Sequence, residues 1–242
     1  MSGPPYNNLK YYTTTTPNGL KGAIVLEELS LTYDHQLIDI TKSAQKEPWF
    51  IEINPNGRVP ALTDGDLKVF ESGAIMLYLT DMYDLDNTIS YKYGTPEYYE
   101  MVSWLMFQMG GIGPMQGQCH HFRVMAPVHS SYGIKRYTDE TNRLYGVLES
   151  RLSQADWLAG DKYTIADIAS YCWIRVSPLV LDFDLSEWPS VEKWVQKIDA
   201  RPAVARAKKI PASPRTEEEL KVFFRSMRDR LDAMKSSEKA NS

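Results

Sequence analysis

Two pairs of residues, Val59-Pro60 and Glu71-Ser72, have the types and spacing to hold a small peptide. A residue before proline is extended, and a cis bond to Pro60 would leave the N–H and C=O groups of Val59 free to pair with a ligand backbone. A helix that opens with Ser72 as its N-cap would receive a carboxylate, while Glu71 could hold an ammonium group. A zwitterionic peptide fits all three groups.

The segments around these pairs would position them. Pro55-Asn56-Gly57 predicts a turn, and a strand should begin at Pro60, because proline is tolerated at the first residue of a strand. After Asp64-Gly65, residues 67–69 are typical of the antiparallel return of a hairpin. The same pattern occurs in many α/β proteins that bind no ligand, so this stretch alone leaves both interpretations open.

The residues before this stretch predict a β-α-β unit. Strands are expected over 9–14 and 31–39, and the spacing of apolar residues over 20–28 predicts an amphipathic helix between them. This order requires a crossover and a parallel strand pair. A short helix should begin at Pro48, with Gln45 on an exposed loop just before it. With the hairpin and a helix from Ser72, the expected order is β-α-β-α-β-β-α.

The second half predicts helices alone. They are expected over 96–109, ending at the glycine-rich run 110–113, over 131–152, and from Pro189. Thr164 and the carboxylate three positions later, Asp167, form a capping-box pattern that should open a buried central helix. The chain is therefore expected to divide into five segments: a flexible leader (1–8), an α/β domain (9–84), a linker (85–95), an all-helical domain (96–215) and an amphipathic C-terminal extension (216–242).

The chain resembles the glutathione transferases. The motifs that carry the resemblance are Thr16-Pro17-Asn18-Gly19, the run Asn54-Pro55-Asn56-Gly57-Arg58-Val59-Pro60 and Glu71-Ser72, and it extends to about Pro211. It is nearest to the nu-class bacterial enzymes and to the fungal proteins similar to the prion-forming yeast nitrogen regulator. It implies a thioredoxin-like α/β N-terminal domain, an all-α C-terminal domain and a homodimer.

The resemblance also implies how a thiol would be activated. The pKa of an ordinary cysteine thiol is about 8.5, and neutral donors at a helix N-terminus lower it. The resemblance gives this catalytic role to Asn18, supported by Thr16, where other classes of the family place Tyr, Ser or Cys. Asn18 would serve equally well as a plain N-cap, and the sequence alone does not separate the two roles.

By the same comparison, five further residues would contact glutathione, the co-substrate. Gln45 would contact its glycine end, Val59 its cysteinyl backbone, and Glu71 and Ser72 its γ-glutamyl group. Arg143 would reach it from the helical domain, although the same residue is equally typical of a helix-surface arginine with a partner on its own helix.

Composition narrows the partners. The formal charge is −4. Basic residues exceed acidic ones over residues 201–242, and elsewhere they are scattered without aromatic platforms, so no nucleic-acid partner is expected. No apolar run approaches the length of a membrane span, and a cytoplasmic protein is expected. Cys172 should be a core residue, whereas Cys119 has a packing or surface role as its first interpretation, with a reactive thiol left open. Neither the adjacent His120-His121 pair nor any other cluster predicts a metal site.

The sequence therefore predicts a glutathione-dependent transferase or oxidoreductase. The glutathione thiolate would attack an electrophile, a peroxide or a disulfide, and the sequence leaves the choice open. The alternative is a catalytically weak glutathione-binding regulatory or ligand-binding protein with the same fold. A glutaredoxin-like cysteine enzyme is disfavoured because no cysteine lies near Thr16.

Overall fold

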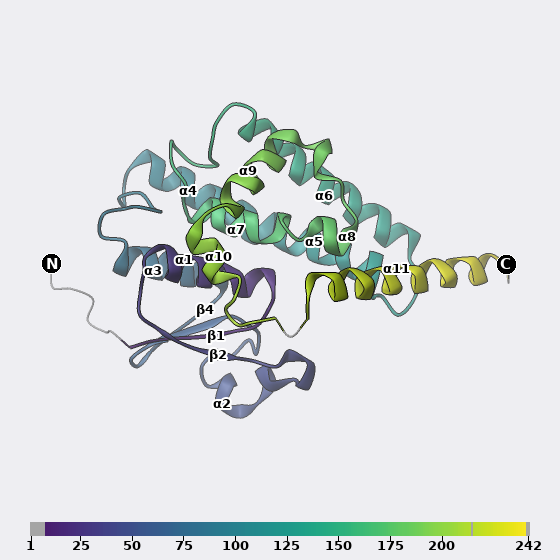
Figure 1. Cartoon of the computed structure of the whole chain (residues 1–242), viewed down its shortest axis with the longest axis horizontal. Helices are drawn as coiled ribbons and strands as arrows, with labels where there is room; N and C mark the ends of the chain where they lie inside the picture. Colours follow the sequence, from purple (N-terminus) through teal and green to yellow (C-terminus); the bar gives the residue numbers. More distant parts are fainter. Residues whose placement is uncertain (1–7, 214, 241–242) are drawn as a thin grey trace.

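The computed structural model describes residues 8–213 and 215–240. A sheet with its helices forms one end of the body and a larger group of helices forms the other (Figure 1). Of the leader expected over 1–8, only Asn8 lies within the described residues. Residues 85–95, where the linker was expected, carry neither helix nor strand.

The sheet has four strands in the order β2-β1-β3-β4. β1 and β2 are parallel, as the β-α-β pattern predicts, while β3 is antiparallel to both β1 and β4. The expected hairpin is confirmed, and the second strand is shorter than predicted. The strand bounds are β1 Leu9–Thr13, β2 Asp34–Leu37, β3 Ala61–Asp64 and β4 Leu67–Phe70.

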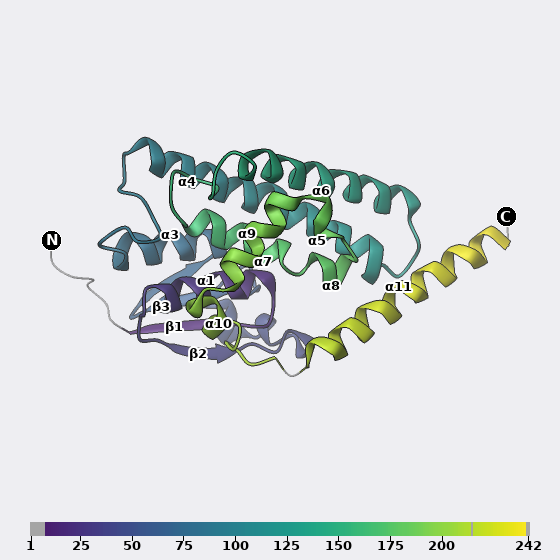
Figure 2. The same ribbon diagram turned by 45° about the horizontal axis from the view of Figure 1, so that its top comes forward.

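Helices cover both faces of the sheet. α1 (Pro17–Glu28) and α3 (Ser72–Tyr83) lie between the sheet and the helical half, while the short α2 (Pro48–Ile51) lies on the opposite face (Figures 1 and 2). Phe50 of α2 packs against Tyr12 in a small separate core on that face. Two 3₁₀ turns, Ile40–Lys42 and Ala44–Lys46, precede α2.

The helical half differs from the prediction at its glycines. The run 110–113 does not end the helix that begins at Pro96: α4 continues into a π-helical turn, Gln108–Ile112, and from there into α5. A π turn widens the helix by one residue and often marks a functional site. The remaining bounds are α4 Pro96–Phe107, α5 Gly113–His120, a second π turn His121–Met125, α6 Ser131–Leu152, α7 Ile165–Ile174, α8 Ser177–Leu181, a 3₁₀ turn Leu185–Glu187, α9 Pro189–Asp199 and α10 Pro202–Ala207.

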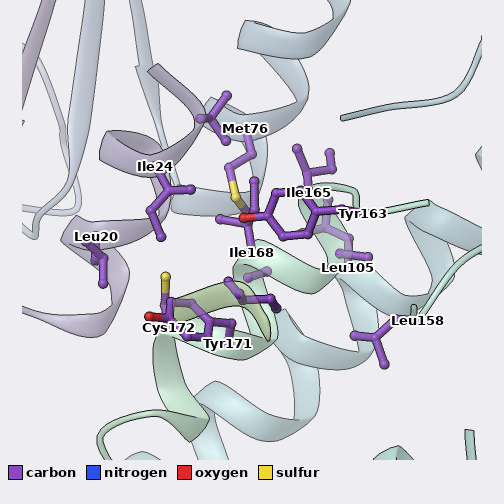
Figure 3. Close-up of a cluster of buried hydrophobic side chains, with 14 of the residues drawn as sticks. Leu20, Ile24, Met76, Leu105, Leu158, Tyr163, Ile165, Ile168, Tyr171 and Cys172 are labelled. Atoms are coloured by element: carbon purple, nitrogen blue, oxygen red, sulfur yellow. The ribbon is translucent and has the colours of Figure 1, made fainter. Parts of the chain in front are cut away.

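α7 is the buried centre of the helical half. Its predicted capping box is present: Thr164 Oγ1 accepts a hydrogen bond from the Ala166 N–H at 3.3 Å, and Asp167 accepts from the Thr164 N–H at 2.9 Å. Ile168 and Cys172 of α7 face Ile24 of α1 across the junction between the halves (Figure 3). One continuous core therefore joins the sheet half to the helical half.

The predicted amphipathic extension is α11, Glu217–Ala240. Its middle part lies against the body, where Arg228 donates to the carbonyl oxygens of Leu179 and Val180, and its C-terminal end extends away from the body (Figure 2). Phe224 lies against the His120 ring. Within residues 8–213 and 215–240, the helices include none with the length and apolar character of a membrane span.

Candidate functional site

The strand register brings three separate segments to one end of the sheet. Ala61, the first residue of β3, pairs with Tyr12 of β1 and with Phe70 of β4. The residues that follow β1, precede β3 and follow β4 therefore leave the sheet at the same edge. Asn18, Val59 and Ser72, which are far apart in the sequence, belong to these three segments.

Val59 has the backbone geometry that the sequence suggested. The Val59–Pro60 bond is cis, and neither the N–H nor the C=O of Val59 forms a hydrogen bond within the described part of the chain. The preceding turn is held by the buried Asn54, whose side chain donates to the Arg58 carbonyl at 2.6 Å and accepts from the Asn56 N–H at 3.0 Å. The Val59 peptide groups are thus held in place with their hydrogen-bonding capacity unused.

α3 begins one residue earlier than predicted. Glu71 stands at the N-cap position with φ 71° and ψ 120°, and Ser72 is the first helical residue rather than the cap. A non-glycine residue at this φ is strained, and such residues gather at ligand sites. The Glu71 carboxylate is exposed, 3.5 Å from the Asn56 amide, while Ser72 is buried.

A buried lysine, Lys21 of α1, lies directly behind Ser72. Its Nζ donates to Ser72 Oγ at 3.1 Å and to Gln108 Oε1 of the π turn at 2.5 Å, and it lies 3.4 Å from Met109 Sδ. Burial lowers its pKa to about 7, against the opposing influence of Cys172 and of Glu71. Together with the α3 N-terminus, Lys21 makes Ser72 a favourable position for a carboxylate.

Sequence reasoning missed Lys21. The sequence signal is a lysine within the run 19–26, where the other residues are small or apolar and where the structure buries every position. A charged residue inside such a run is rarely buried without a partner. Its partners, however, are Ser72 of α3 and Gln108 of a π turn that no local sequence pattern predicted.

Thr16 and Asn18 have different roles at the start of α1. Thr16 is the N-cap, and its Oγ1 accepts from the Gly19 N–H at 3.1 Å. The interpretation of Asn18 as a plain N-cap is therefore wrong. Its Oδ1 instead accepts a hydrogen bond from the indole Nε1–H of Trp173, on α7, at 2.9 Å. Asn18 is half-buried at the positive end of the helix dipole, where an amide can donate to an anion.

Gln45 is less exposed than predicted. It lies in the 3₁₀ turn Ala44–Lys46, half-buried, and its side-chain Oε1 is buried without a hydrogen-bond partner among the described residues. Its backbone carbonyl lies close to Gly57, whose positive φ of 59° turns the chain just before Val59. Gln45 therefore lies close to the turn that precedes Val59.

Comparison with protein families agrees with this geometry. Residues 7–81 match the glutathione S-transferase N-terminal domain, and residues 129–202 match the glutathione S-transferase C-terminal domain. The chain belongs to the glutathione S-transferase family. The predicted resemblance and the predicted two-part fold are both confirmed.

Two named relatives of this chain represent the two groups that the sequence suggested, the bacterial enzymes and the yeast nitrogen regulator. Disulfide-bond oxidoreductase YfcG of Escherichia coli is 41% identical over 203 residues, which cover 81% of this chain and 92% of that protein. The transcriptional regulator URE2 of Saccharomyces cerevisiae is 34% identical over 230 residues, covering 80% of this chain and 65% of the regulator.

A solved structure extends the likeness to three dimensions. The glutathione transferase homologue from Lodderomyces elongisporus, crystallised with two GSH per subunit, superimposes with a TM-score of 0.80 at 41% identity. The match covers 84% of this chain and 99% of that one. This chain is therefore similar in both sequence and backbone arrangement to a protein that was crystallised with glutathione.

Arg143 is the one predicted site residue that the structure does not connect to the others. It is exposed on α6 and donates through Nε and Nη2 to both carboxylate oxygens of Glu140, at 2.8 Å each. Arg143 and Glu140 also line an open cavity of about 620 Å³, together with Met115 and Arg136. Arg143 would have to leave Glu140 to reach a ligand.

The two cysteines of this chain are both buried. Burial raises the pKa of the Cys119 thiol, which contacts Thr138 Oγ1 at 3.6 Å, and raises that of Cys172 to about 12. Neither thiol is therefore present as a thiolate near neutral pH, which answers the open question on Cys119 in favour of packing. In the part of the chain that the structure describes, no three His, Cys, Asp or Glu side chains are grouped to hold a metal ion.

Proposed function

We propose that this protein binds glutathione at the edge formed by Val59, Glu71 and Ser72 and activates the thiol of that tripeptide beside Asn18. The observation that carries the proposal is the conjunction of three groups at one edge of the sheet. These are the unpaired Val59 peptide groups, a serine hydroxyl backed by a buried ammonium group, and an amide at the N-terminus of α1.

Each end of glutathione has a matching partner at this edge. The γ-glutamyl carboxylate fits the Ser72 hydroxyl and the N-terminus of α3, and its ammonium group fits the exposed Glu71 carboxylate. The cysteinyl backbone pairs with Val59 in the manner of an added strand. Gln45, whose buried Oε1 has no hydrogen-bond partner among the residues that the structure describes, stands at the glycine end, and Arg143 contributes from the helical domain once it leaves Glu140.

The reactive sulfur is supplied by the substrate, because both cysteines of the chain are buried and have raised pKa values. Asn18 and the α1 dipole stabilise the glutathione thiolate, and Thr16 fixes the loop by capping the helix. With a disulfide substrate, this thiolate bonds to one sulfur while the other leaves as a thiolate, giving a mixed disulfide with glutathione. With an electrophilic carbon, a thioether forms instead.

The likeness to YfcG favours disulfide reduction, and the likeness to a regulator favours the second candidate, a glutathione-binding protein with little catalysis. Calorimetric titration with reduced and with oxidised glutathione tests glutathione binding, which both candidate functions require. Turnover of a mixed disulfide, a peroxide and a model electrophile separates the candidates. Binding without turnover supports the regulator, and the absence of both heat and a shift in melting temperature rejects the proposal.

The assembly expected from the family, a homodimer, is part of this proposal. Size-exclusion chromatography with light scattering measures the mass in solution directly. A mass close to twice 27.7 kDa supports the dimer, and a mass of one chain rejects it.

A further inference from the structure

The indole of Trp173 makes a hydrogen bond between parts of the chain that are 155 residues apart in sequence. Its Nε1–H donates to Asn18 Oδ1 at 2.9 Å. An indole N–H can only donate, so the Asn18 atom that faces it must be the amide oxygen. The orientation of the Asn18 carboxamide is thereby decided by chemistry, with its NH₂ group directed away from the ring.

The NH₂ group of Asn18 is available to a ligand. It forms no hydrogen bond with the residues that the structure describes, and the N-cap position of α1 is already filled by Thr16. Without Trp173, the carboxamide would be free to rotate and to present its oxygen toward an approaching sulfur. A carbonyl oxygen repels a thiolate, whereas an amide N–H stabilises it.

Trp173 is itself held firmly. Gln116 Nε2 donates to the Trp173 carbonyl at 2.7 Å, and Tyr145 Oη donates to Gln116 Oε1 at 2.9 Å. Gln116 and Tyr145 are both buried. Gly117 and Gly113 line the ring closely, since a Cβ at either position would lie 3.5 Å from it. The chain of contacts therefore runs from α6 through α5 and α7 to the start of α1.

We propose that Trp173 is a positioning residue for thiol activation: its indole N–H fixes Asn18 so that the amide NH₂ faces the sulfur of bound glutathione. The inference rests on the proposed function, because it assigns Trp173 a task at that same site. Trp173 does not touch the reacting atoms and acts through Asn18. The helical half of the molecule thus sets the electrostatics of a site built mainly on the sheet half.

The variant Trp173→Phe removes the N–H and keeps an aromatic ring against the two glycines. We expect the thiol pKa of bound glutathione, followed by thiolate absorbance near 240 nm, to rise by about one unit. We expect kcat/KM at pH 6.5 to fall roughly tenfold, while the dissociation constant of glutathione stays within about twofold. Trp157→Phe is the matched control, because this second tryptophan of the helical half forms no described hydrogen bond through its indole N–H.

A double-mutant cycle with Asn18→Ala isolates the route of the effect. If Trp173 acts through Asn18, then Trp173→Phe lowers the rate no further in the Asn18→Ala background. Equal losses in both backgrounds overturn the inference, as does an unchanged thiol pKa in the single variant.

Amide NMR of the ligand-free protein keeps this inference separate from the proposed function. In the wild type, the Asn18 carboxamide should give one well-resolved pair of side-chain signals, and Trp173→Phe should broaden or average them. An unchanged Asn18 pair overturns the positioning role whatever the protein binds. A changed pair in a protein that gives no heat with glutathione supports the positioning and rejects the proposed function alone.

Discussion

The two ends of the proposed glutathione site differ in charge: one contains a buried ammonium group, and the other contains only neutral groups. At the γ-glutamyl end, Ser72 is backed by the buried ammonium group of Lys21, whose other partner is Gln108. At the thiol end, Asn18 is neutral and is held by the neutral indole of Trp173. At both ends a residue of the helical half supports the site: Gln108 at the γ-glutamyl end and Trp173 at the thiol end.

The difference follows from the charge that each end must stabilise. The γ-glutamyl carboxylate is ionised at every physiological pH, so the protonated Lys21 behind Ser72 adds affinity without interfering with reaction. The thiolate must form and then react, and its nucleophilicity falls as its pKa falls. A neutral donor lowers the thiol pKa moderately and leaves the sulfur reactive. The site therefore places a full charge where it binds and a dipole where it reacts.

The largest effect is expected at the thiol end. Asn18→Ala removes the donor to the sulfur and should lower kcat/KM with a disulfide or electrophile by about 10²-fold. Glutathione affinity, which depends on the other end, should remain roughly intact by calorimetry. Asn142→Ala, an exposed asparagine on α6, is the control. Unchanged turnover would remove Asn18 from its role.

At the γ-glutamyl end the change should appear in binding. Lys21→Met removes the ammonium group that contacts Ser72 and should weaken glutathione binding about tenfold at pH 6.5, as measured by calorimetry. Because burial lowers the pKa of Lys21 to about 7, the gap between variant and wild type should narrow as the pH rises above 7. The exposed Lys193→Met on α9 is the control, and equal affinities across this pH range would refute the assignment.

Lys21 should also influence stability with a defined sign. In the unfolded chain its pKa is about 10.4, so between pH 7 and 9 the unfolded state binds more protons than the folded state. In the wild type, Lys21 therefore makes a contribution to the free energy of unfolding that increases with pH over this range. The Lys21→Met variant lacks this contribution. Urea unfolding at pH 6.5, 7.5 and 8.5 should show the stability of the variant relative to the wild type falling as the pH rises.

A substitution remote from both ends of the proposed site should change neither glutathione binding nor thiol activation. Thr164→Ala removes the buried cap of α7 and should lower the free energy of unfolding by about 1–2 kcal/mol, measured with urea. The kcat/KM of the remaining folded protein should be unchanged. Thr95→Ala removes the cap of the more exposed α4 and should cost less. A loss of thiol activation in Thr164→Ala would mean that α7 stability and Asn18 orientation are not separable.

The smallest effect is expected from Arg143→Ala. Its side chain is exposed and paired with Glu140, and an exposed ion pair contributes little. Leaving Glu140 offsets most of what a contact with glutathione would add, so affinity should fall by no more than about threefold in the same calorimetric assay. A loss of tenfold or more would make the helical half a third major binding element.

Most of the sheet half could be predicted from local patterns. Its hairpin and its parallel pair, like the capping box at Thr164 in the helical half, each depend on a few adjacent residues whose preferences agree. The π turn at Gln108–Ile112 could not be predicted in this way, because glycines and Pro114 favour a helix end unless tertiary packing holds the helix together. The start of α3 was displaced by one residue because Glu71 adopts a strained conformation that local rules disfavour.

The candidate site likewise contains some residues that sequence patterns predict and others that they do not. Asn18, Val59, Glu71 and Ser72 stand in recognisable motifs, and the register brings their segments together. Their supports, Lys21 and Trp173, were beyond sequence reasoning because each forms a hydrogen bond across the junction between the halves, to a residue 87 or 155 positions away. Periodicity assigned both residues to helices without saying what their side chains would meet.

The burial of α1 on several sides limits how this protein can be divided. Its Ile24 faces α7 in the core, and near its C-terminal end Glu28 receives both Nε and Nη2 of Arg201 at 2.6 and 2.9 Å. A fragment ending near Tyr83 would expose that apolar face to water and leave the carboxylate without its partner. The first half is consequently a poor candidate for independent expression, and gene fusions or truncations of this chain should keep both halves together.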